Sequence, residues 1–384
     1  MTSFAIRGAN VQVLVDGARI TAVGPVDGGE PAERVVDATD CWVLPGFIDL
    51  QVNGAIGVDL TTEPHRVGEV AAYLVQCGVT SFMPTLISSS VSMTESAIAA
   101  IGAWSQQEQS GGARSLGVHL EGPFLNPVRA GAHPVQCLRQ PSLEEVDGWR
   151  REAGVAMVTI APELPRAIEV IERLVSTGVA VCAGHSDAGV ADMRAGIAAG
   201  VTGVTHLFNA MSPITARAPG AAGATLADPA LIAGMIVDGF HVDPTMVRLA
   251  WRALGPHRIA LVTDAIAALG LPHGAYRVGE TSVVVDRSGA RTLGGVLAGS
   301  VLHFDQAVRN LIAFTGCAVA EASTAASATP ARLARRTDIG RLVPGCSADI
   351  VLLDKQLHVA ATFVDGRVVF DPHRRCGRPT TAGT

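Results

Sequence analysis

The chain contains four short apolar stretches that each end in a polar, ionisable side chain: Gly117-Val-His-Leu-Glu121, Ala180-Val-Cys-Ala-Gly-His185, Val201-Thr-Gly-Val-Thr-His206 and Ile259-Ala-Leu-Val-Thr-Asp264. A short apolar run of this kind is typical of a strand buried on both faces of a parallel sheet. In a (β/α)₈ barrel, the active-site residues lie at the carboxyl ends of such strands. One glutamate, two histidines and one aspartate at these positions indicate a hydrolytic metal site.

Strand-like and helix-like segments alternate through the middle of the chain. Helical patterns occur, for example, at residues 92–101 and 164–176, and a β-hairpin at 276–285 precedes a helix near 301–314. Eight alternating strands predict an α/β fold, a (β/α)₈ TIM-like barrel, which we place at residues 45–339. The eight expected strands are 44–52, 78–85, 116–121, 155–161, 179–184, 201–206, 232–238 and 258–263.

The two ends of the chain have a different pattern. Residues 1–44 and the residues from about 340 onward contain short β-rich runs separated by Gly, Pro and Asp turns. Asp365-Gly366 lies between two such runs and is a strong hairpin signal. We therefore expect residues 1–44 and 340–376 to pair into one small β-sandwich domain, with the barrel inserted between them.

Composition favours an enzyme with a large core. Of 384 residues, 48% are apolar and 17% charged, and the net charge is −6 without a basic tract, which argues against nucleic acid as a partner. No uninterrupted apolar stretch reaches the roughly 18 residues of a membrane span. The N-terminus lacks a signal-peptide pattern, and the seven cysteines include no CxxC pair. We expect a cytoplasmic protein with reduced thiols.

Lysine is almost absent from this chain. Lys355 is the only one, and it lies outside the predicted barrel. A carbamylated lysine that bridges two metals is therefore not expected, and neither is a Schiff-base mechanism. Any anionic group that holds a metal must be a carboxylate.

The polar residues at the strand ends each have more than one interpretation. Glu121 in a barrel mouth needs a cation or a hydrogen-bond cluster, or else a structural ion pair with an arginine. His185 or His206 alone could be a core histidine, but with Glu121 they leave an open position for water on Zn²⁺ or a similar ion. Asp264 is placed as a general base, with a further ligand or an N-cap as alternatives. His119, on the same face as Glu121, is expected to support the site or to pack.

The chain resembles the N-acetylglucosamine-6-phosphate deacetylases of the amidohydrolase superfamily over almost its whole length. The segments HLEGPF and THLFNAM are specific to this branch, whereas the Pro-Gly-Phe-Ile-Asp opening is shared across the superfamily. The motifs are Pro45-Gly-Phe-Ile-Asp-Leu-Gln-Val-Asn-Gly54, His119-Leu-Glu-Gly-Pro-Phe-Leu-Asn126, Gly131-Ala-His133, Gly184-His-Ser186, Thr205-His-Leu-Phe-Asn-Ala-Met211, Asp238-Gly-Phe-His-Val-Asp243 and Leu261-Val-Thr-Asp-Ala265.

One departure from the superfamily pattern concerns the number of metals. Gln51 and Asn53 stand where most members carry two histidines after the first strand. Neutral amides are poor ligands for zinc-like ions. The resemblance is thus to the deacetylases with one tightly held divalent metal, and a second metal on this side is expected to bind weakly at best.

The resemblance also implies roles for individual residues. Glu121, His185 and His206 hold one divalent metal per subunit, with Zn²⁺ expected and Fe²⁺ or another divalent ion as alternatives. Asp264 takes a proton from the attacking water and returns it to the departing amine, and His133 polarises the substrate carbonyl. The residues implied in substrate binding are Ala132, Asn209, Ala210, Arg217, His241 and Leu297, with Arg217 reaching in from the partner subunit of a homodimer.

The implied reaction is hydrolysis of the acetamide of N-acetyl-D-glucosamine 6-phosphate, a step of aminosugar catabolism and cell-wall recycling. A deacetylase for the N-acetylgalactosamine epimer remains an alternative, because one hydroxyl direction depends on loop geometry. An inactive homologue that serves as a scaffold would be expected to lack Asp264 or a metal ligand, and all are present. Dihydroorotase or hydantoinase chemistry is disfavoured, because the His-x-His pair and a barrel lysine are missing.

Overall fold

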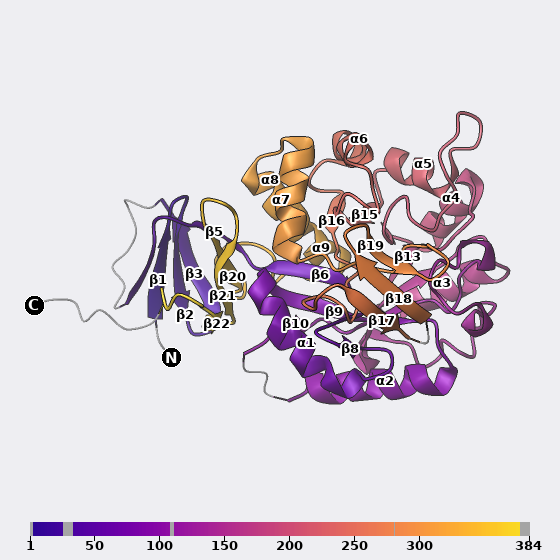
Figure 1. Cartoon of the computed structure of the whole chain (residues 1–384), viewed down its shortest axis with the longest axis horizontal. Helices are drawn as coiled ribbons and strands as arrows, with labels where there is room; N and C mark the ends of the chain where they lie inside the picture. The colour runs from indigo at the N-terminus through magenta and orange to yellow at the C-terminus, as the bar shows by residue number, and fades with distance from the viewer. Residues whose placement is uncertain (1–2, 26–33, 108–110, 280, 377–384) are drawn as a thin grey trace, which may run out of the picture.

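The computed structural model describes residues 3–25, 34–107, 111–279 and 281–376 (Figure 1). A parallel barrel forms the larger part of the molecule, and its strands are bonded in chain order from the first to the last. All eight predicted strands are present, which confirms the TIM-like barrel. They are β6 (Phe47–Val52), β9 (Val79–Ile87), β11 (Val118–Glu121), β12 (Val155–Ile160), β13 (Ala180–Ala183), β14 (Gly203–Val204), β15 (Ile232–Met235) and β16 (Ile259–Leu261), and a short β10 (Arg114–Ser115) also pairs with β9.

Helices cover the outside of the barrel (Figure 1). The apolar residues of the third helix recur at positions 167, 170, 171 and 174 and are buried, as an amphipathic helix requires. The second helix begins after Ser90, whose hydroxyl accepts a hydrogen bond from the Met93 amide. The helices are α1 (Val67–Leu74), α2 (Val91–Ser105), α3 (Ala167–Ser176), α4 (Val190–Ala199), α5 (Gly220–Ala227), α6 (Pro244–Leu254), α7 (Phe304–Thr315), α8 (Val319–Ala326) and α9 (Ala328–Leu333).

The connections at the carboxyl ends of the strands include two irregular segments. Between β11 and β12 the described chain forms only 3₁₀ turns: η4 (Pro127–Arg129), η5 (Val135–Cys137) and η6 (Arg151–Ala153). After β16, the sequence predicts a two-stranded hairpin at 276–285, and this prediction is wrong because it omits one strand. The structure has three antiparallel strands, β17 (Gly274–Val278), β18 (Thr281–Asp286) and β19 (Gly289–Thr292). The third strand was missed because its sequence, Gly-Ala-Arg-Thr, has no apolar alternation.

Two four-stranded sheets lie beside the barrel (Figure 1). The first has the order β3-β2-β1-β4, from β1 (Ser3–Gly8), β2 (Gln12–Asp16), β3 (Arg19–Gly24) and β4 (Val35–Ala38). The second has the order β22-β21-β20-β5, from β5 (Trp42–Pro45), β20 (Ile350–Leu353), β21 (Val359–Val364) and β22 (Arg367–Phe370). Both sheets contribute to one apolar cluster, in which the rings of Phe4 and Phe363 stack at 6.0 Å. The division into domains at 44/45 and 339/340 stays a prediction.

None of the helices in the described part of the chain has the length and apolar character needed to cross a bilayer.

The barrel is closed at its seam by an isolated backbone bridge and by side-chain hydrogen bonds rather than by a regular ladder. Between β6 and the segment after β16 there is a single parallel bridge, Val52 to Ala265. The buried carboxylate of Asp49 spans this seam, because it accepts hydrogen bonds from the Thr263 hydroxyl at 2.5 Å and the Thr263 amide at 3.2 Å. The Asp264 amide in turn donates to the Gln51 carbonyl at 3.0 Å. These bonds fix β6 against the chain that carries Asp264.

We expect the contribution of Asp49 to stability to depend on pH. Burial raises the pKa of Asp49 to about 7, whereas an unfolded aspartate titrates near pH ~4. The contribution is therefore fully present below about pH 4 and is lost as the pH rises through about 7. Asp49→Asn has no carboxyl group to titrate at this position. As the pH rises from about 5 to about 8, the melting temperature of the wild type should therefore fall relative to that of the variant. A difference between the two proteins that stays constant over this range would contradict the assignment.

Candidate metal and active site

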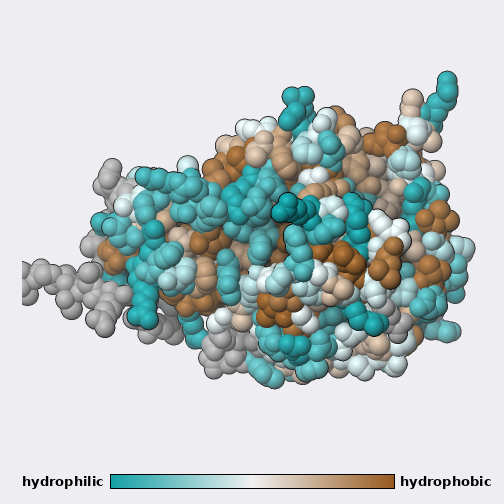
Figure 2. Space-filling model, in the orientation of Figure 1, coloured by the Kyte–Doolittle hydropathy of each residue, from teal (hydrophilic) through white to brown (hydrophobic). Residues whose placement is uncertain are grey.

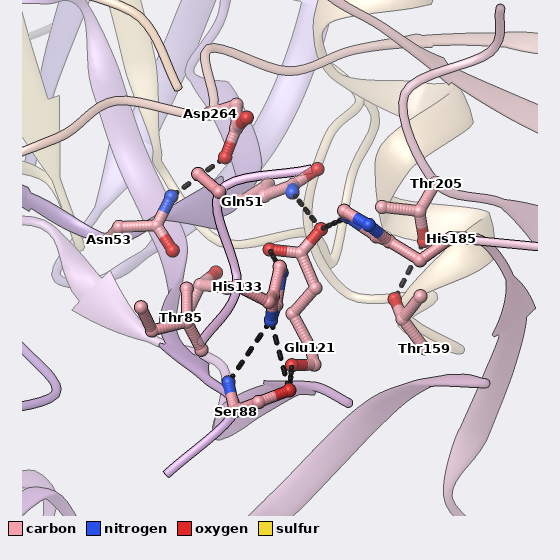
Figure 3. A network of polar contacts seen from close by, with 12 residues as sticks. Gln51, Asn53, Thr85, Ser88, Glu121, His133, Thr159, His185, Thr205 and Asp264 are labelled. Atoms are coloured by element: carbon pink, nitrogen blue, oxygen red, sulfur yellow. Dashed lines mark hydrogen bonds and ion pairs between the residues drawn. The ribbon is translucent and has the colours of Figure 1, made fainter. Parts of the chain in front are cut away.

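One carboxylate oxygen and two imidazole nitrogens, from Glu121, His185 and His206 at the ends of β11, β13 and β14, converge in the barrel mouth. Figure 3 shows Glu121 and His185 of this cluster with the polar residues around them. His206 Nε2 lies 3.0 Å from Glu121 Oε1, His185 Nε2 lies 3.3 Å from the same oxygen, and the two imidazole nitrogens are 3.0 Å apart. All three side chains are buried. This is the one cluster of metal-ligating side chains found among the described residues.

The backbone after each strand turns these side chains into the mouth. His185, His206 and Asp264 have φ values of 48°, 31° and 52°, a left-handed conformation that non-glycine residues seldom adopt. Strain of this kind persists where the surrounding structure enforces it, and it is common at functional sites.

The donor set fits a divalent cation. His185 Nδ1 donates to the Arg129 carbonyl at 2.8 Å, so the lone pair of His185 Nε2 faces Glu121 and His206. A carboxylate and imidazole lone pairs at such short range repel one another unless a proton or a cation lies between them. Four-coordinate Zn²⁺ with bonds of about 2.0–2.1 Å places neighbouring ligand atoms roughly 3.3 Å apart, close to the separations observed here.

The charges in the cluster also suit metal ligation. Burial acts to raise the pKa of Glu121, but hydrogen bonds from the imidazoles of His133 and His206 hold that pKa well below its usual range. Burial, together with the nearby His133, lowers the pKa of His185 to about 4. Glu121 is therefore ionised and His185 neutral near pH ~7, which are the forms that bind a metal.

The two amides on β6 act as hydrogen-bond donors. Gln51 Nε2 donates to Glu121 Oε1 at 2.8 Å, and Asn53 Nδ2 donates to Asp264 Oδ1 at 2.7 Å (Figure 3). Because these N–H groups point at the carboxylates, Gln51 and Asn53 hold Glu121 and Asp264 in place.

Asp264 lies across the mouth from the cluster. Burial and the charge of Glu121 raise the pKa of Asp264 to about 6. Asn53 occupies Oδ1, which leaves Oδ2 as the atom able to accept a proton. A carboxylate with a pKa near neutrality is suited to general base chemistry.

His133 is held in one tautomer by Ser88, a residue that sequence reasoning missed. The Ser88 amide donates to His133 Nδ1 at 3.2 Å, and the Ser88 hydroxyl lies 2.9 Å from the same nitrogen. The proton of His133 is therefore on Nε2, which lies 3.6 Å from Glu121 Oε2. Gly122, at φ 89°, leaves the space for this contact, because a side chain at residue 122 would collide with Ser88 Oγ.

A second layer of hydrogen bonds lies beneath the cluster. His119 Nδ1 donates to the Leu50 carbonyl at 3.0 Å, so Nε2 accepts from the Thr159 hydroxyl at 2.8 Å. Thr159 Oγ1 lies 2.7 Å from Thr205 Oγ1, in the residue before His206. Burial lowers the pKa of His119 to about 4, so the ring is neutral. His119 thus connects β6, β11 and β12 to the chain that carries His206.

A cavity of about 410 Å³ opens above the cluster. Sequence reasoning missed Arg129 and an apolar set that also line it: Ile87, Ile236, Ile266, Val278 and Val296. Arg129 lies near His133 in sequence and could have been found. The apolar residues come from strand ends and loops that are far apart in the chain, so no local pattern marks them. The predicted residues that line the cavity are Asn53, Glu121, Ala132, His133, His185, His206, Asn209, Ala210, His241, Asp264 and Leu297.

Two predicted residues do not line this cavity. Gln51 is buried behind Glu121. Arg217 is exposed on the connection between β14 and α5, so this chain alone does not bring it to the cavity. His241 is in place, and its Nδ1 contacts Asp238 Oδ2 at 2.7 Å.

Comparisons with known proteins agree with this geometry. A model of the amidohydrolase family matches residues 42–369. The N-acetylglucosamine-6-phosphate deacetylase of Homo sapiens is 41% identical over 359 residues, which cover 88% of this chain and 86% of that protein. The enzyme of the same name from Bacillus subtilis (strain 168) is 33% identical over 368 residues, with 94% and 93% covered.

Solved structures give the same result. A mutant N-acetyl-D-glucosamine-6-phosphate deacetylase from Mycobacterium smegmatis in complex with N-acetyl-D-glucosamine-6-phosphate aligns with a TM-score of 0.88 at 32% identity, over 96% of this chain and 99% of that one. The N-acetylglucosamine-6-phosphate deacetylase from Thermotoga maritima aligns with a TM-score of 0.86 at 32% identity, over 94% and 95%.

The hydrogen bonds predict opposite tautomers for two neighbouring histidines. In metal-free protein at neutral pH, His133 should carry its proton on Nε2 and His185 on Nδ1. Nitrogen-15 NMR of histidine-labelled protein distinguishes the two, with His133→Gln and His185→Gln providing the assignments. Finding both rings protonated at the same nitrogen would contradict this arrangement of the site.

Proposed function

The chain belongs to the amidohydrolase family, in the branch of the N-acetylglucosamine-6-phosphate deacetylases, and on this premise we propose how its residues carry out the reaction. The protein hydrolyses the acetamide of N-acetyl-D-glucosamine 6-phosphate to D-glucosamine 6-phosphate and acetate. The observation that carries this conclusion is the buried Glu/His/His cluster facing an aspartate in the barrel mouth, in a chain that is 41% identical to a deacetylase of that name.

The family is metal-dependent, and we assign the metal to Glu121, His185 and His206, one divalent ion per subunit. We propose Zn²⁺, because one carboxylate and two imidazoles suit it; Fe²⁺ or another divalent ion is the alternative. A divalent metal bound there polarises the acetyl carbonyl and lowers the pKa of the attacking water. The donor amides of Gln51 and Asn53 support the assignment of a single tight site.

Asp264 and His133 carry out the proton chemistry. Asp264 Oδ2 accepts the proton of the attacking water while Asn53 keeps Oδ1 in place. The same carboxyl then returns the proton to the departing amine, so that the leaving group is neutral. His133 has its Nε2–H group beside Glu121. Through this group it donates a hydrogen bond to the oxygen of the substrate carbonyl, where negative charge develops.

Substrate orientation falls to the residues around the cavity. We assign phosphate binding to His241, which Asp238 holds, and to the backbone at Asn209-Ala210, and contact with the acetyl group or the sugar ring to Ala132 and Leu297; all of them line the cavity. Without barrel lysines, a guanidinium is the remaining strong cationic ligand for a phosphate dianion. We assign that role to Arg217 of the partner subunit in a homodimer.

Exposed apolar side chains support a dimer formed near the mouth. Val128 is 75% exposed and Val296 49%, and both line the cavity. Figure 2 shows brown, apolar surface in the region of the three-stranded sheet. Val284 of β18 and Leu293, the residue after β19, are exposed. Exposed apolar patches of this kind commonly mark interaction sites. A second subunit on this face would bring its own residues close to the cavity.

We also propose a cytoplasmic location. All seven cysteines are free thiols, and six of them are buried, which fits a reducing compartment.

The first test measures the deacetylase activity and the role of Asp264 as its general base. Wild-type protein should release acetate from N-acetylglucosamine 6-phosphate faster than from the galactosamine epimer. Asp264→Asn should keep its fold, one metal equivalent and its KM but lose about 10²–10⁴-fold in kcat. Acetate release measures kcat and KM, and elemental analysis measures the metal content. If Asp264→Asn loses the metal, Asp264 is a metal ligand and not the general base. If the wild type releases acetate faster from N-acetylgalactosamine 6-phosphate, that epimer is the substrate.

The second test concerns phosphate binding across the subunit interface. Arg217→Ala should raise KM for the phosphorylated sugar by about 10²-fold and change little for the unphosphorylated one, since the ion pair is the lost interaction. Mixing Arg217→Ala with Asp264→Asn should restore part of the activity, because one hybrid site then carries both intact residues. Equal losses on both sugars, or no recovery on mixing, would remove Arg217 from the site.

A further inference from the structure

A glutamate that the proposed reaction does not use lies at the carboxyl end of β12. Glu163 follows this strand in the segment Ala161-Pro162-Glu163 and is partly buried. β12 pairs with β11 on one side and with β13 on the other, so its carboxyl end lies between the strand that ends in Glu121 and the strand that leads to His185. β12 contributes none of the three assigned ligands, yet it is followed by a carboxylate beside the segments that carry two of them.

Both carboxylate oxygens of Glu163 accept hydrogen bonds from the turn that follows β13. The Ser186 hydroxyl donates to Oε2 at 2.7 Å, and the Asp187 amide donates to Oε1 at 2.6 Å. Oε1 also accepts from Asn126 Nδ2 at 2.9 Å, in the segment that follows β11. Hydrogen bonds to an ionised carboxylate are roughly twice as strong as neutral ones. One carboxylate therefore joins the chain after β11 to the chain after β13.

The turn that Glu163 holds sets the direction of the His185 imidazole. His185 has a φ of 48°, a conformation that persists where the surrounding structure enforces it. Two further bonds orient this residue, because its carbonyl accepts from the Asn126 amide at 2.9 Å and its Nδ1 donates to the Arg129 carbonyl at 2.8 Å. Both bonds require the two segments to keep their relative position, which the carboxylate of Glu163 fixes.

The other contacts of this turn do not replace Glu163. Arg129 and Asp187 form an ion pair at 2.7 Å, but their side chains are 30% and 45% exposed, so solvent screens this pair. Ser186 Oγ accepts from the Ala188 amide at 3.1 Å, which extends the hydrogen bonds of Glu163 to the end of the turn. Loss of the carboxylate would remove the acceptor of three donors at once and would loosen the turn as a whole.

We propose that Glu163 is a positioning residue for the metal site, which acts through the turn 185–187 to hold His185 in the orientation that a divalent ion requires. The inference rests on the proposed assignment of the metal to Glu121, His185 and His206. Groups that orient a metal ligand from behind typically contribute about 10–100-fold to metal affinity. The hydrogen bonds, and not the negative charge, are the proposed cause.

Zn²⁺ binding to the metal-free protein, measured by competition with a chromophoric chelator, tests the proposal. Glu163→Ala should weaken Zn²⁺ binding by about 10–100-fold, because His185 is no longer held. Glu163→Gln should stay within a few-fold of the wild type, because its side-chain oxygen still accepts from Asn126 and Asp187. This difference between the two variants separates the hydrogen bonds from the charge.

Asp349→Ala is the matched control for a general loss of stability. Asp349 is buried, and its carboxylate accepts from Arg114 Nη1 at 2.9 Å and from the Asp365 amide at 3.0 Å. Arg114 pairs with Ser81 near the start of β9, at the amino end of the barrel. The control should therefore melt at a lower temperature than the wild type and bind Zn²⁺ equally well.

Nitrogen-15 NMR of the metal-free protein gives a readout that does not depend on the ion. In the wild type, His185 carries its proton on Nδ1, which donates to the Arg129 carbonyl. In Glu163→Ala this bond weakens, and the ring signals should move toward the average of the two tautomers. Glu163→Gln and Asp349→Ala should keep the signals of the wild type.

Zn²⁺ binding in Glu163→Ala that equals the wild type, or binding in Glu163→Gln or Asp349→Ala as weak as in Glu163→Ala, would overturn the proposal. If Glu163→Ala does not fold, Ser186→Ala takes its place; it should weaken Zn²⁺ binding by a few-fold, and unchanged binding refutes the proposal. A wild-type protein that binds neither Zn²⁺ nor Fe²⁺ would remove the metal site itself, and with it the proposed function. The wild type thus distinguishes that failure from a failure of Glu163 alone.

Discussion

The buried charge of Glu121 is the constraint around which the barrel mouth is arranged. Its carboxylate is 3% exposed, and an ionised carboxylate in that environment needs several compensating contacts. Gln51 donates to one oxygen, and the imidazoles of His185 and His206 lie within 3.3 Å of it. Because three strands must end at the same height to provide these contacts, the register of the parallel sheet follows from the same constraint. A divalent cation bound between these atoms would complete the compensation, which is why the cluster is a candidate metal site.

The same logic extends to the seam of the barrel. β6 carries the two amides, and the chain after β16 carries Asp264, yet the two segments share an isolated bridge with a few backbone hydrogen bonds in place of a regular ladder. Asp49 and Thr263 make the connection through side-chain hydrogen bonds, so the position of the proposed base relative to Asn53 depends on a buried carboxylate deeper in the barrel. The hydrogen bonds inside the barrel therefore help to set the geometry of the candidate site at its mouth. The superfamily opening Pro-Gly-Phe-Ile-Asp49 has a physical role here, because its aspartate closes the barrel.

Much of this architecture could be predicted from the sequence, for a physical reason. Parallel strands are buried on both faces, so an apolar run that ends in one ionisable residue specifies both a strand and its functional end. Glu121, His185, His206 and Asp264 were found in this way. The residues that sequence reasoning missed act through contacts between segments far apart in the chain: Ser88 holds His133 through its backbone amide, and Thr159 on β12 contacts His119 on the neighbouring strand β11. Hydroxyl residues are common and carry no pattern of their own. Their roles depend on strand register and loop packing.

The near-absence of lysine gives the arginines of this protein unusual significance. With Lys355 as the only alternative, every strong interaction with an anion must use a guanidinium, a histidine or a backbone amide. Several arginines of the barrel are already paired with a carboxylate, as Arg114 is with Asp349 and Arg139 with Glu145, and are thereby less available to a ligand.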